Sequence, residues 1–437
     1  MEQDLDRESL IWANYGFLSN PFETRPLSLF SQSDLSVSNA YLPREETDEL
    51  NPSEKLDQFL KSEGGGCVLV EGKIGVGKTS LVNHHRNEWR KTSRPLFTPI
   101  SEISAEKDWT KRQFLIDILS CLARTFITEL DDKAIENNRL LMEVIATTGT
   151  YYQSKSGKTY GFSIAGSGVQ FGQGKATTIH KGEISNTQLE DYIRRVIGMC
   201  REDGYRGVLI HLDNIEILLD KDADACRAFF DDIRDVLQIK DAYYVFVARS
   251  GFFQQVISPQ ERVRSIFYSN PIHVRPFTEN ETIAIINKRY EVLAHVDRQF
   301  IKPVDDDLIR RLCRIHDSRI RHVMNDIEML ILENISPNRV GTLKTGQALD
   351  ALKKLTEEKL NCLTSGQKKF MLSLPVDPFS NQDLVDATGK SKQNVSNVLR
   401  ELKKNNFIRQ AEGEEEHVYE ISPEFEILFG AEREGKA

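Results

Sequence analysis

Residues 72–79 read Gly-Lys-Ile-Gly-Val-Gly-Lys-Thr and have the composition and spacing of a phosphate-binding loop. Glycines let successive backbone N–H groups turn toward phosphate oxygens, and the helix that follows adds the positive end of its dipole. Lys78 would reach the β- and γ-phosphates, and the Thr79 hydroxyl would ligate Mg²⁺. The expected nucleotide ligands are Gly72, Gly75, Val76, Gly77, Lys78, Thr79 and Ser80. The sequence therefore predicts a site for a nucleoside triphosphate together with Mg²⁺.

The elements around this loop are those that the chemistry needs. An apolar run at residues 67–70 predicts a buried parallel strand, and a helix begins at residues 80–85. A second apolar run, at 207–216, predicts a strand that ends in acidic residues. Such a strand directs a carboxylate toward the metal carried by Thr79, which makes Asp213 the second Mg²⁺ residue.

A further buried strand is predicted at residues 242–248, and it ends at Arg249 and Ser250. A polar side chain at this position can reach the γ-phosphate or the attacking water, so Ser250 and Arg249 are candidates. The alternative is a strand that simply ends in a polar turn.

Apolar periodicity predicts several other elements. We expect a helix over 44–60, a short strand at 95–100, a long amphipathic helix over 109–130 and a helix near 189–201. A β-hairpin is expected within an insertion at about 155–180, with one strand from Tyr160 and the other ending at Phe171. The residues that flank it are Lys155, Lys158, Lys175 and Lys181. These lysines could contact DNA, or they could discourage aggregation at a sheet edge.

The composition limits the classes of protein that need to be considered. A chain of 437 residues should form two or three domains, and 39% apolar with 28% charged residues is ordinary for a soluble protein. No apolar run has the length of a membrane span, and the N-terminus is neither a secretory signal nor a transit peptide. Six scattered cysteines predict reduced thiols and no zinc site, and hence a cytoplasmic protein. The net charge of −9 requires any DNA contact to come from a local basic patch.

An aromatic segment at residues 15–22 stands out near the N-terminus. Two interpretations are open. The segment is either a strap packed against a core or a direct contact to adenine.

The phosphate loop, the Asp-ending strand, the polar-ending strand and the helical region that follows together resemble an AAA+ ATPase. Segments 261–267, 272–281 and 286–290 are similar to the initiator-type branch, which includes origin-recognition and helicase-loading ATPases. The chain is also similar to bacterial ATPases of mobile elements and defence systems. The resemblance implies an α/β fold: a P-loop core with a parallel sheet, then a helical lid. It also implies hydrolysis of ATP to ADP and phosphate in an oligomer.

The resemblance implies roles for three arginines. In this family an arginine of the matching Arg-Val-x-Ser segment acts on the γ-phosphate of a neighbouring subunit, which points to Arg262 or Arg264. The alternative for both is a solvated basic turn. Arg319 matches the second sensor, which reaches from the lid to the phosphates, although His316 stands where the family has glycine.

The chain departs from the family at Asn214, where the family usually has a glutamate that accepts a proton from the attacking water. Asparagine can orient water but cannot accept its proton. Glu216 is a candidate to accept the proton in its place. However, strand alternation would put Glu216 on the same face as Asn214 but at a different height along the strand. We therefore expect slow hydrolysis, with ATP acting substantially as a conformational switch.

The C-terminal residues resemble a winged helix over 363–429. Helices are expected at 364–374, after an N-cap at Ser380, and at 391–404, followed by a hairpin that ends at Ile421. The third helix exposes residue types that suit the major groove. These are Lys392, Gln393, Asn394, Asn397 and Arg400. The acidic turn at 412–416 would repel phosphate, so a protein-binding domain is the alternative to double-stranded DNA.

These expectations combine into a four-part chain with an N-terminal strap, a P-loop core, a helical lid and a winged-helix domain. The expected bounds are 1–40, 41–275, 276–360 and 361–437. Nucleotide state would control assembly on DNA or engagement of a partner. The alternative is a nucleotide-gated scaffold with a protein-binding winged helix and negligible hydrolysis.

Overall fold

The computed structural model describes residues 7–29, 35–45, 51–150, 152–153, 159–160, 184–220, 222–268, 270–338, 340–411 and 417–429. The chain divides into two compact units. The first, which we call the helical unit, comprises Met1–Thr47, Gly72–Gly77 and Val274–Ala437. The second, the sheet unit, comprises Asp48–Glu71 and Lys78–His273.

The sheet unit is built on a parallel β-sheet. Its strands are β1 (Gly65–Glu71), β2 (Leu96–Phe97), β3 (Ile103–Ser104), β6 (Gly207–Asp213), β7 (Ala242–Ala248) and β8 (Ile272–His273). The order is β2-β6-β7-β1-β8, with β3 also paired to β6, and every pairing is parallel. The predicted α/β class with a parallel sheet is confirmed.

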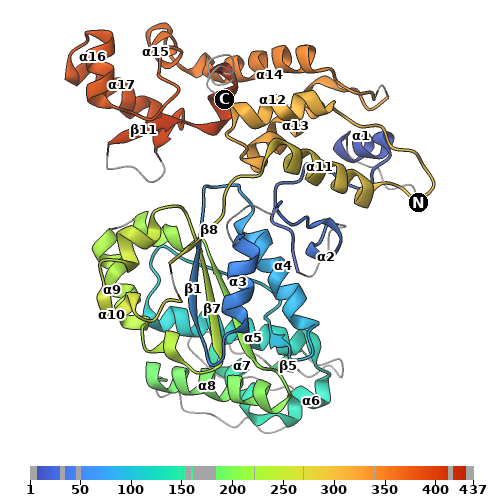
Figure 1. Ribbon diagram of the computed structural model, residues 1–437, viewed down its shortest axis with the longest axis vertical. Coiled ribbons are helices and arrows are strands. Elements are labelled where there is room, and N and C mark those ends of the chain that lie inside the picture. The colour runs from blue at the N-terminus through green and yellow to red at the C-terminus, as the bar shows by residue number, and fades with distance from the viewer. Residues whose placement is uncertain are drawn as a thin grey trace. The chain divides into compact units, whose positions relative to one another are not determined.

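Helices pack on both faces of this sheet, and every residue of β6 and β7 is therefore buried. On one face, Tyr243 packs edge-on against Phe59. On the other, Phe246 belongs to the apolar core that also contains Phe114. The helices are α3 (Pro52–Lys61), α4 (Lys78–Arg90), α5 (Lys111–Glu129), α6 (Asp132–Asn137), α7 (Arg139–Thr148), α8 (Asn186–Glu202), α9 (Ala223–Ile233) and α10 (Glu261–Arg264) (Figure 1). Shorter helical turns are η1 (Ile215–Asp220), η2 (Val236–Gln238) and η3 (Phe253–Ile257).

Local sequence signals explain where these helices begin. The Thr110 hydroxyl accepts a hydrogen bond from the Gln113 amide and so starts α5, close to the predicted position. The helix expected over 44–60 begins only at Pro52. The Asn51 side chain caps it, and a proline at the first helical position favours that start.

The predicted lysine-flanked hairpin lies almost entirely outside the described residues. Strands β4 (Tyr152–Gln153) and β5 (Thr159–Tyr160) pair antiparallel just before it. Residues 161–183 and all four flanking lysines are not described, so the hairpin stays a prediction.

The helical unit joins the N-terminal segment to the helices that follow the sheet. Its helices are α1 (Arg7–Tyr15), α2 (Val37–Ala40), α11 (Glu279–Leu293), α12 (Asp306–Ile315), α13 (Ile320–Asn334), α14 (Thr345–Lys359) and η4 (Leu360–Cys362). The Phe17 ring stacks on Tyr290 of α11 with centroids 5.3 Å apart, and Phe22 meets the same tyrosine edge-on. The aromatic segment at 15–22 is therefore packed into this core in the manner of a strap. Among the described residues, no helix is long and apolar enough to cross a membrane.

The C-terminal domain of this unit has its own apolar core. Its elements are α15 (Ser365–Met371), β9 (Phe379–Ser380), α16 (Asn381–Thr388), α17 (Lys392–Lys404), β10 (Ile408–Gln410), β11 (Val418–Ile421) and η5 (Pro423–Phe429). The three helices and the hairpin follow the predicted order, and Ser380 caps α16 as predicted. The sequence did not predict β9, which pairs with β11, or η5, which packs against α14 and α12.

Candidate functional site

The phosphate loop has the backbone that its glycines predict. Gly75 and Gly77 have φ values of 81° and 86°, in the left-handed region that favours glycine. A Cβ atom on Gly72 would lie 2.6 Å from the carbonyl oxygen of Val274, so any side chain there would clash. Val76 is fully buried. Three of the predicted ligands are thus glycines for steric or conformational reasons.

Arg44 lies against this loop, which the sequence did not predict. Its guanidinium stacks on the Phe277 ring at 4.0 Å from the centroid and donates to the Val76 carbonyl oxygen. The side chain is 7% exposed, and its Nε and Nη1 atoms have no hydrogen-bond partner among the described residues. Burial lowers the pKa of Arg44 to about 10, so the group stays cationic at neutral pH. A buried cation is therefore present beside the loop.

In the sheet unit, the start of α4 meets the end of β6. The Thr79 hydroxyl donates to Asp213 Oδ2 at 2.8 Å, and the Asn214 amide donates to Asp213 Oδ1 at 2.9 Å. Burial raises the pKa of Asp213, and these two hydrogen bonds oppose the rise. A hydroxyl and a carboxylate at this spacing are oxygen donors of the kind that Mg²⁺ prefers. Lys78 is buried immediately before Thr79.

The segment after Asp213 corrects our expectation for Glu216. The strand ends at Asp213, because Asn214 takes a left-handed conformation with φ 57° and leads into η1. Strand alternation therefore does not apply to Glu216. The exposed Asn214 side chain donates instead to the Ser104 hydroxyl at 3.1 Å.

Glu216 has a buried carboxylate oxygen, Oε2, without a hydrogen-bond partner among the described residues. Burial raises the pKa of Glu216. The Asp213 carboxylate adds to the rise, and the charges of Lys78 and Arg249 oppose it. Arg249 and Ser250 are half-buried directly after β7. The structure thus brings Glu216 into electrostatic contact with Lys78, Asp213 and Arg249, three groups that the sequence singled out.

Arg262 and Arg264 are exposed on α10, which is held by the buried Val263. An arginine that acts on a neighbouring subunit must be exposed in the free chain. A solvated turn is exposed as well, so both interpretations stay open.

Arg319 is 4% exposed and its guanidinium is engaged within the helical unit. Its Nε donates to the His316 carbonyl oxygen at 2.9 Å, and Nη2 pairs with Glu426 of η5. Arg321, two residues later, also lies at the phosphate loop. Its Cβ is 3.0 Å from the position that a Cβ on Gly75 would take.

His316 sits between two carboxylates. Its Nδ1 is 2.7 Å from Glu426 Oε2, and its Nε2 is 2.8 Å from Asp326 Oδ2. Both ring nitrogens can donate only when the imidazole is protonated. Although burial opposes it, the interactions with Asp326 and Glu426 raise the pKa of His316 to about 9. The neighbouring His322 is kept neutral, because burial and the charges of Arg319 and His316 lower its pKa to about 3.

This arrangement predicts that the helical unit loses stability at alkaline pH. The folded pKa of about 9 exceeds the ordinary 6.5, so the stabilisation is complete below pH 6.5 and disappears as the pH rises through 9. A shift of this size corresponds to about 3 kcal/mol. The measurement is urea unfolding at pH 6 and pH 10, followed by Trp12 fluorescence with Trp89 and Trp109 replaced by phenylalanine. The His316→Gln variant should lack this pH-dependent loss, and an equal loss in both proteins would contradict the assignment.

The five predicted DNA-contacting residues all lie exposed on α17. The opposite face of the helix carries Val395, Leu399 and Leu402 into the domain core. Gln393 Nε2 donates to Asn397 Oδ1 at 3.3 Å, one turn apart. The acidic turn at 412–416 is outside the described residues.

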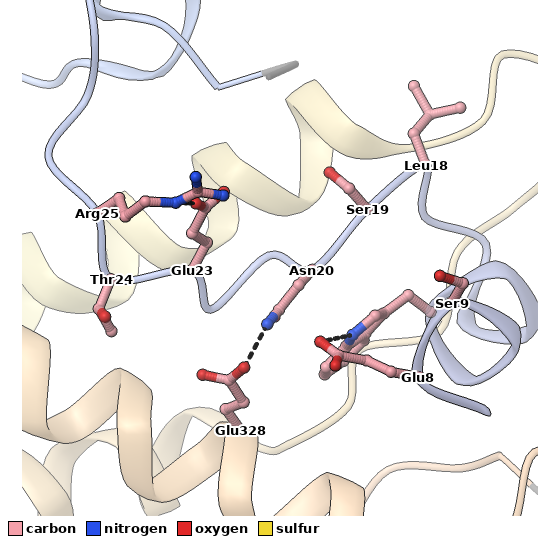
Figure 2. A pocket seen from close by; sticks show the side chains of 10 residues that line it. Glu8, Ser9, Leu18, Ser19, Asn20, Glu23, Thr24, Arg25 and Glu328 are labelled. Carbon is pink, nitrogen blue, oxygen red and sulfur yellow. Dashed lines mark hydrogen bonds and ion pairs between the residues drawn. The ribbon is translucent and has the colours of Figure 1, made fainter. Parts of the chain in front are cut away.

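A pocket of about 540 Å³ lies elsewhere in the helical unit (Figure 2). The N-terminal segment and α13 line it, with Glu8, Glu23 and Glu328 among its residues and Asn20 Nδ2 donating to Glu328 at 2.6 Å. None of the predicted nucleotide or DNA residues lines this pocket.

No family model and no curated protein matches the chain. Similar solved structures include the Aeropyrum pernix ORC2 protein in ADPNP–ADP complexes, with 10% identity and a TM-score of 0.44 over 95% of this chain and 98% of that one. The A. pernix ORC1 protein in complex with DNA has 15% identity and a TM-score of 0.40, over 89% and 95%. Cdc6p from Pyrobaculum aerophilum has 12% identity and a TM-score of 0.40, over 92% and 97%. Values this low do not transfer a function to this chain.

Sequence reasoning missed Arg44, Arg321 and Glu426. Arg44 stood at the start of a segment that was expected to be helical, so no signal marked it. Arg321 could have been found from its position near a helix start. Helix α13 begins at Ile320, so Arg321 lies in the first turn of this helix. Glu426 pairs with a residue 110 positions away, and nothing local indicates that contact.

Proposed function

We propose that this chain is an AAA+ protein that binds ATP with Mg²⁺ at residues 72–80 and hydrolyses it slowly. Its nucleotide state would control assembly on DNA or engagement of a partner. The hydrogen bond from Thr79 to Asp213 supports this most strongly, because it joins the end of the phosphate loop to the acidic strand end. That pairing of a hydroxyl and a carboxylate is the one that phosphoryl-transfer sites use for the metal.

Each residue of the proposed site has a chemical task. Lys78 stabilises negative charge on the β- and γ-phosphates. Mg²⁺, held by Thr79 and Asp213, would supply further charge neutralisation. Glu216 accepts the proton of the attacking water, a task that Asn214 cannot perform. Arg249 and Ser250 orient the water or the γ-phosphate.

The proposal also gives roles to two arginine side chains of the helical unit, Arg44 and Arg321. Arg44 is a buried cation at the loop and would contact the nucleotide. Arg321 would take the role that the resemblance implied for Arg319, because Arg319 is engaged by Glu426. Arg262 and Arg264 would act on the nucleotide of a neighbouring copy.

The proposal is tested by ATP turnover of the purified chain, with and without duplex DNA. Slow turnover that rises with DNA supports a DNA-dependent ATPase. If the folded protein neither binds nor hydrolyses ATP, the proposal is overturned.

Duplex DNA binding is expected to weaken in the variants Lys392→Ala and Arg400→Ala. Each lost phosphate contact should reduce the slope of log affinity against log salt by about 1. Fluorescence anisotropy with labelled duplex at several salt concentrations measures both quantities. Lys354→Ala, an exposed lysine of α14, is the matched control. Salt-insensitive binding, or equal effects in the control, would refute the role of α17.

A second function is favoured by Asn214 and by the acidic residues at 412–416. Without a proton acceptor at position 214, the chain could be a nucleotide-gated scaffold whose C-terminal domain binds protein. This alternative predicts tight ATP binding, negligible turnover and no duplex binding at moderate salt.

A further inference from the structure

The segment η5 belongs to two apolar cores at once. Phe425 and Phe429 pack in the core of the C-terminal domain, and Phe425 meets Phe407 with ring centroids 4.7 Å apart. Ile427 packs instead in the core formed by the lid helices and the N-terminal segment. Because η5 follows directly on β11, it fixes the C-terminal domain to the lid within the helical unit.

Glu426 is the polar member of η5, and it enters the turn between α12 and α13. It is 2% exposed, and its two oxygens bind different residues of that turn, His316 and Arg319. Asp326 binds the other ring nitrogen of His316. Two carboxylates thus face two cations in a buried cluster. Removing one partner from such a cluster leaves an uncompensated buried charge, which is strongly unfavourable.

The turn that this cluster holds is conformationally strained. Asp317 and Ser318 have φ values of 48° and 55°, in the left-handed region that costs free energy for residues other than glycine. Such backbone persists only where the surroundings impose it. Here Arg319 Nε binds the His316 carbonyl across the turn, and Glu426 clamps both residues.

The first turn of α13 reaches the phosphate loop directly after this clamp. Arg319 is the N-cap of α13, and Arg321 lies two residues further on, with its Cβ against Gly75. Arg321 is half-buried, and among the described residues no hydrogen bond or ion pair holds its guanidinium. Its position therefore depends on where the helix begins, and the clamped turn determines that.

We propose that Glu426 is a positioning residue for nucleotide binding. By clamping His316 and Arg319 it fixes the start of α13 and holds Arg321 at the phosphate loop. The C-terminal domain and the loop are coupled through this residue. A ligand of the C-terminal domain that displaces η5 must then change nucleotide affinity, and nucleotide must change the affinity for that ligand by the same factor. The coupling to nucleotide rests on the proposed function, whereas the placement of α13 does not.

The placement is tested without nucleotide. Spin labels at Lys73→Cys and Asn325→Cys, with the exposed Cys362 replaced by serine, report the distance between the loop and α13 within the helical unit. Glu426→Gln should broaden or shift the distance distribution relative to wild type. Glu424→Gln, the same change at an exposed position of η5, is the matched control and should leave it unaltered. An unaltered distribution in folded Glu426→Gln overturns the proposal.

The coupling is tested by a double-mutant cycle in unlabelled protein. Glu426→Gln and Arg321→Ala should each weaken the binding of a fluorescent ATP analogue by about tenfold, and the double variant should be no weaker than Arg321→Ala. A purely structural role would instead give additive losses, and additivity overturns the coupling. If Glu426→Gln does not fold, Glu426→Asp, which keeps the charge but shortens the reach, replaces it in both experiments. If wild type binds no nucleotide but Glu426→Gln still changes the distance between the loop and α13, the proposed function fails and the positioning role survives.

Discussion

The Glu216→Gln variant is expected to lower ATP turnover by about 10² to 10⁴-fold, the usual contribution of a positioned base, while ATP affinity changes little. Glutamine keeps the size of the side chain and can still orient water, but it cannot accept a proton. Glu216 Oε2 is buried and has no hydrogen-bond partner among the described residues, and it interacts electrostatically with Lys78 and Arg249, which is the structural reason for this expectation. Single-turnover hydrolysis with enzyme in excess isolates the chemical step from product release.

Asn214→Ala is the natural comparison for this experiment. Its side chain faces Ser104, so we expect it to change turnover far less than Glu216→Gln. A wild-type rate in Glu216→Gln, or an equal loss in both variants, would remove Glu216 as the base. The nucleotide-gated scaffold would then be the better description of the chain.

Lys78→Ala is expected to lower turnover by at least about 10²-fold, because a preorganised charge at the phosphates is lost. The same change should remove most of the stabilisation that ATP gives to the fold. A ligand at 100 times its dissociation constant stabilises by about 2.7 kcal/mol, which thermal unfolding with and without ATP detects easily.

The control for Lys78→Ala is Lys91→Ala, an exposed lysine just beyond the other end of α4. This control should keep both the turnover and the thermal shift of wild type. An undiminished thermal shift in Lys78→Ala would place the nucleotide, if one binds, at another site.

The parts of the fold that were predictable are those with strong local signals. Strands β1, β6 and β7 are continuous apolar runs, and α5 has both a cap at Thr110 and a regular apolar stripe. Strands β3, β8 and β9 have only two residues each, too few for any periodicity to show. Residues 44–45 were assigned to a helix because the apolar pattern of α3 was extended backwards past Asn51, its cap.

In the candidate site, too, the residues marked by local sequence signals were predictable, and those that depend on tertiary contacts were not. Asp213 was found because a phosphate loop implies an acidic strand end, and its contact with Thr79 followed from that rule. The position of Glu216 was misjudged because the left-handed backbone at Asn214 breaks the strand, which no residue pattern announced. The clamp of Glu426 on His316 and Arg319 arises only when η5 packs on α12 and α14. It is a tertiary contact, and it engages the Arg319 guanidinium within the helical unit.

Isothermal titration of ATP into the purified chain, with Mg²⁺ present, tests the central claim most directly. The account predicts saturable binding of one ATP per chain, retained in Glu216→Gln and lost in Lys78→Ala. Absence of binding in folded wild type, or equal binding in Lys78→Ala, would contradict a nucleotide site at residues 72–80.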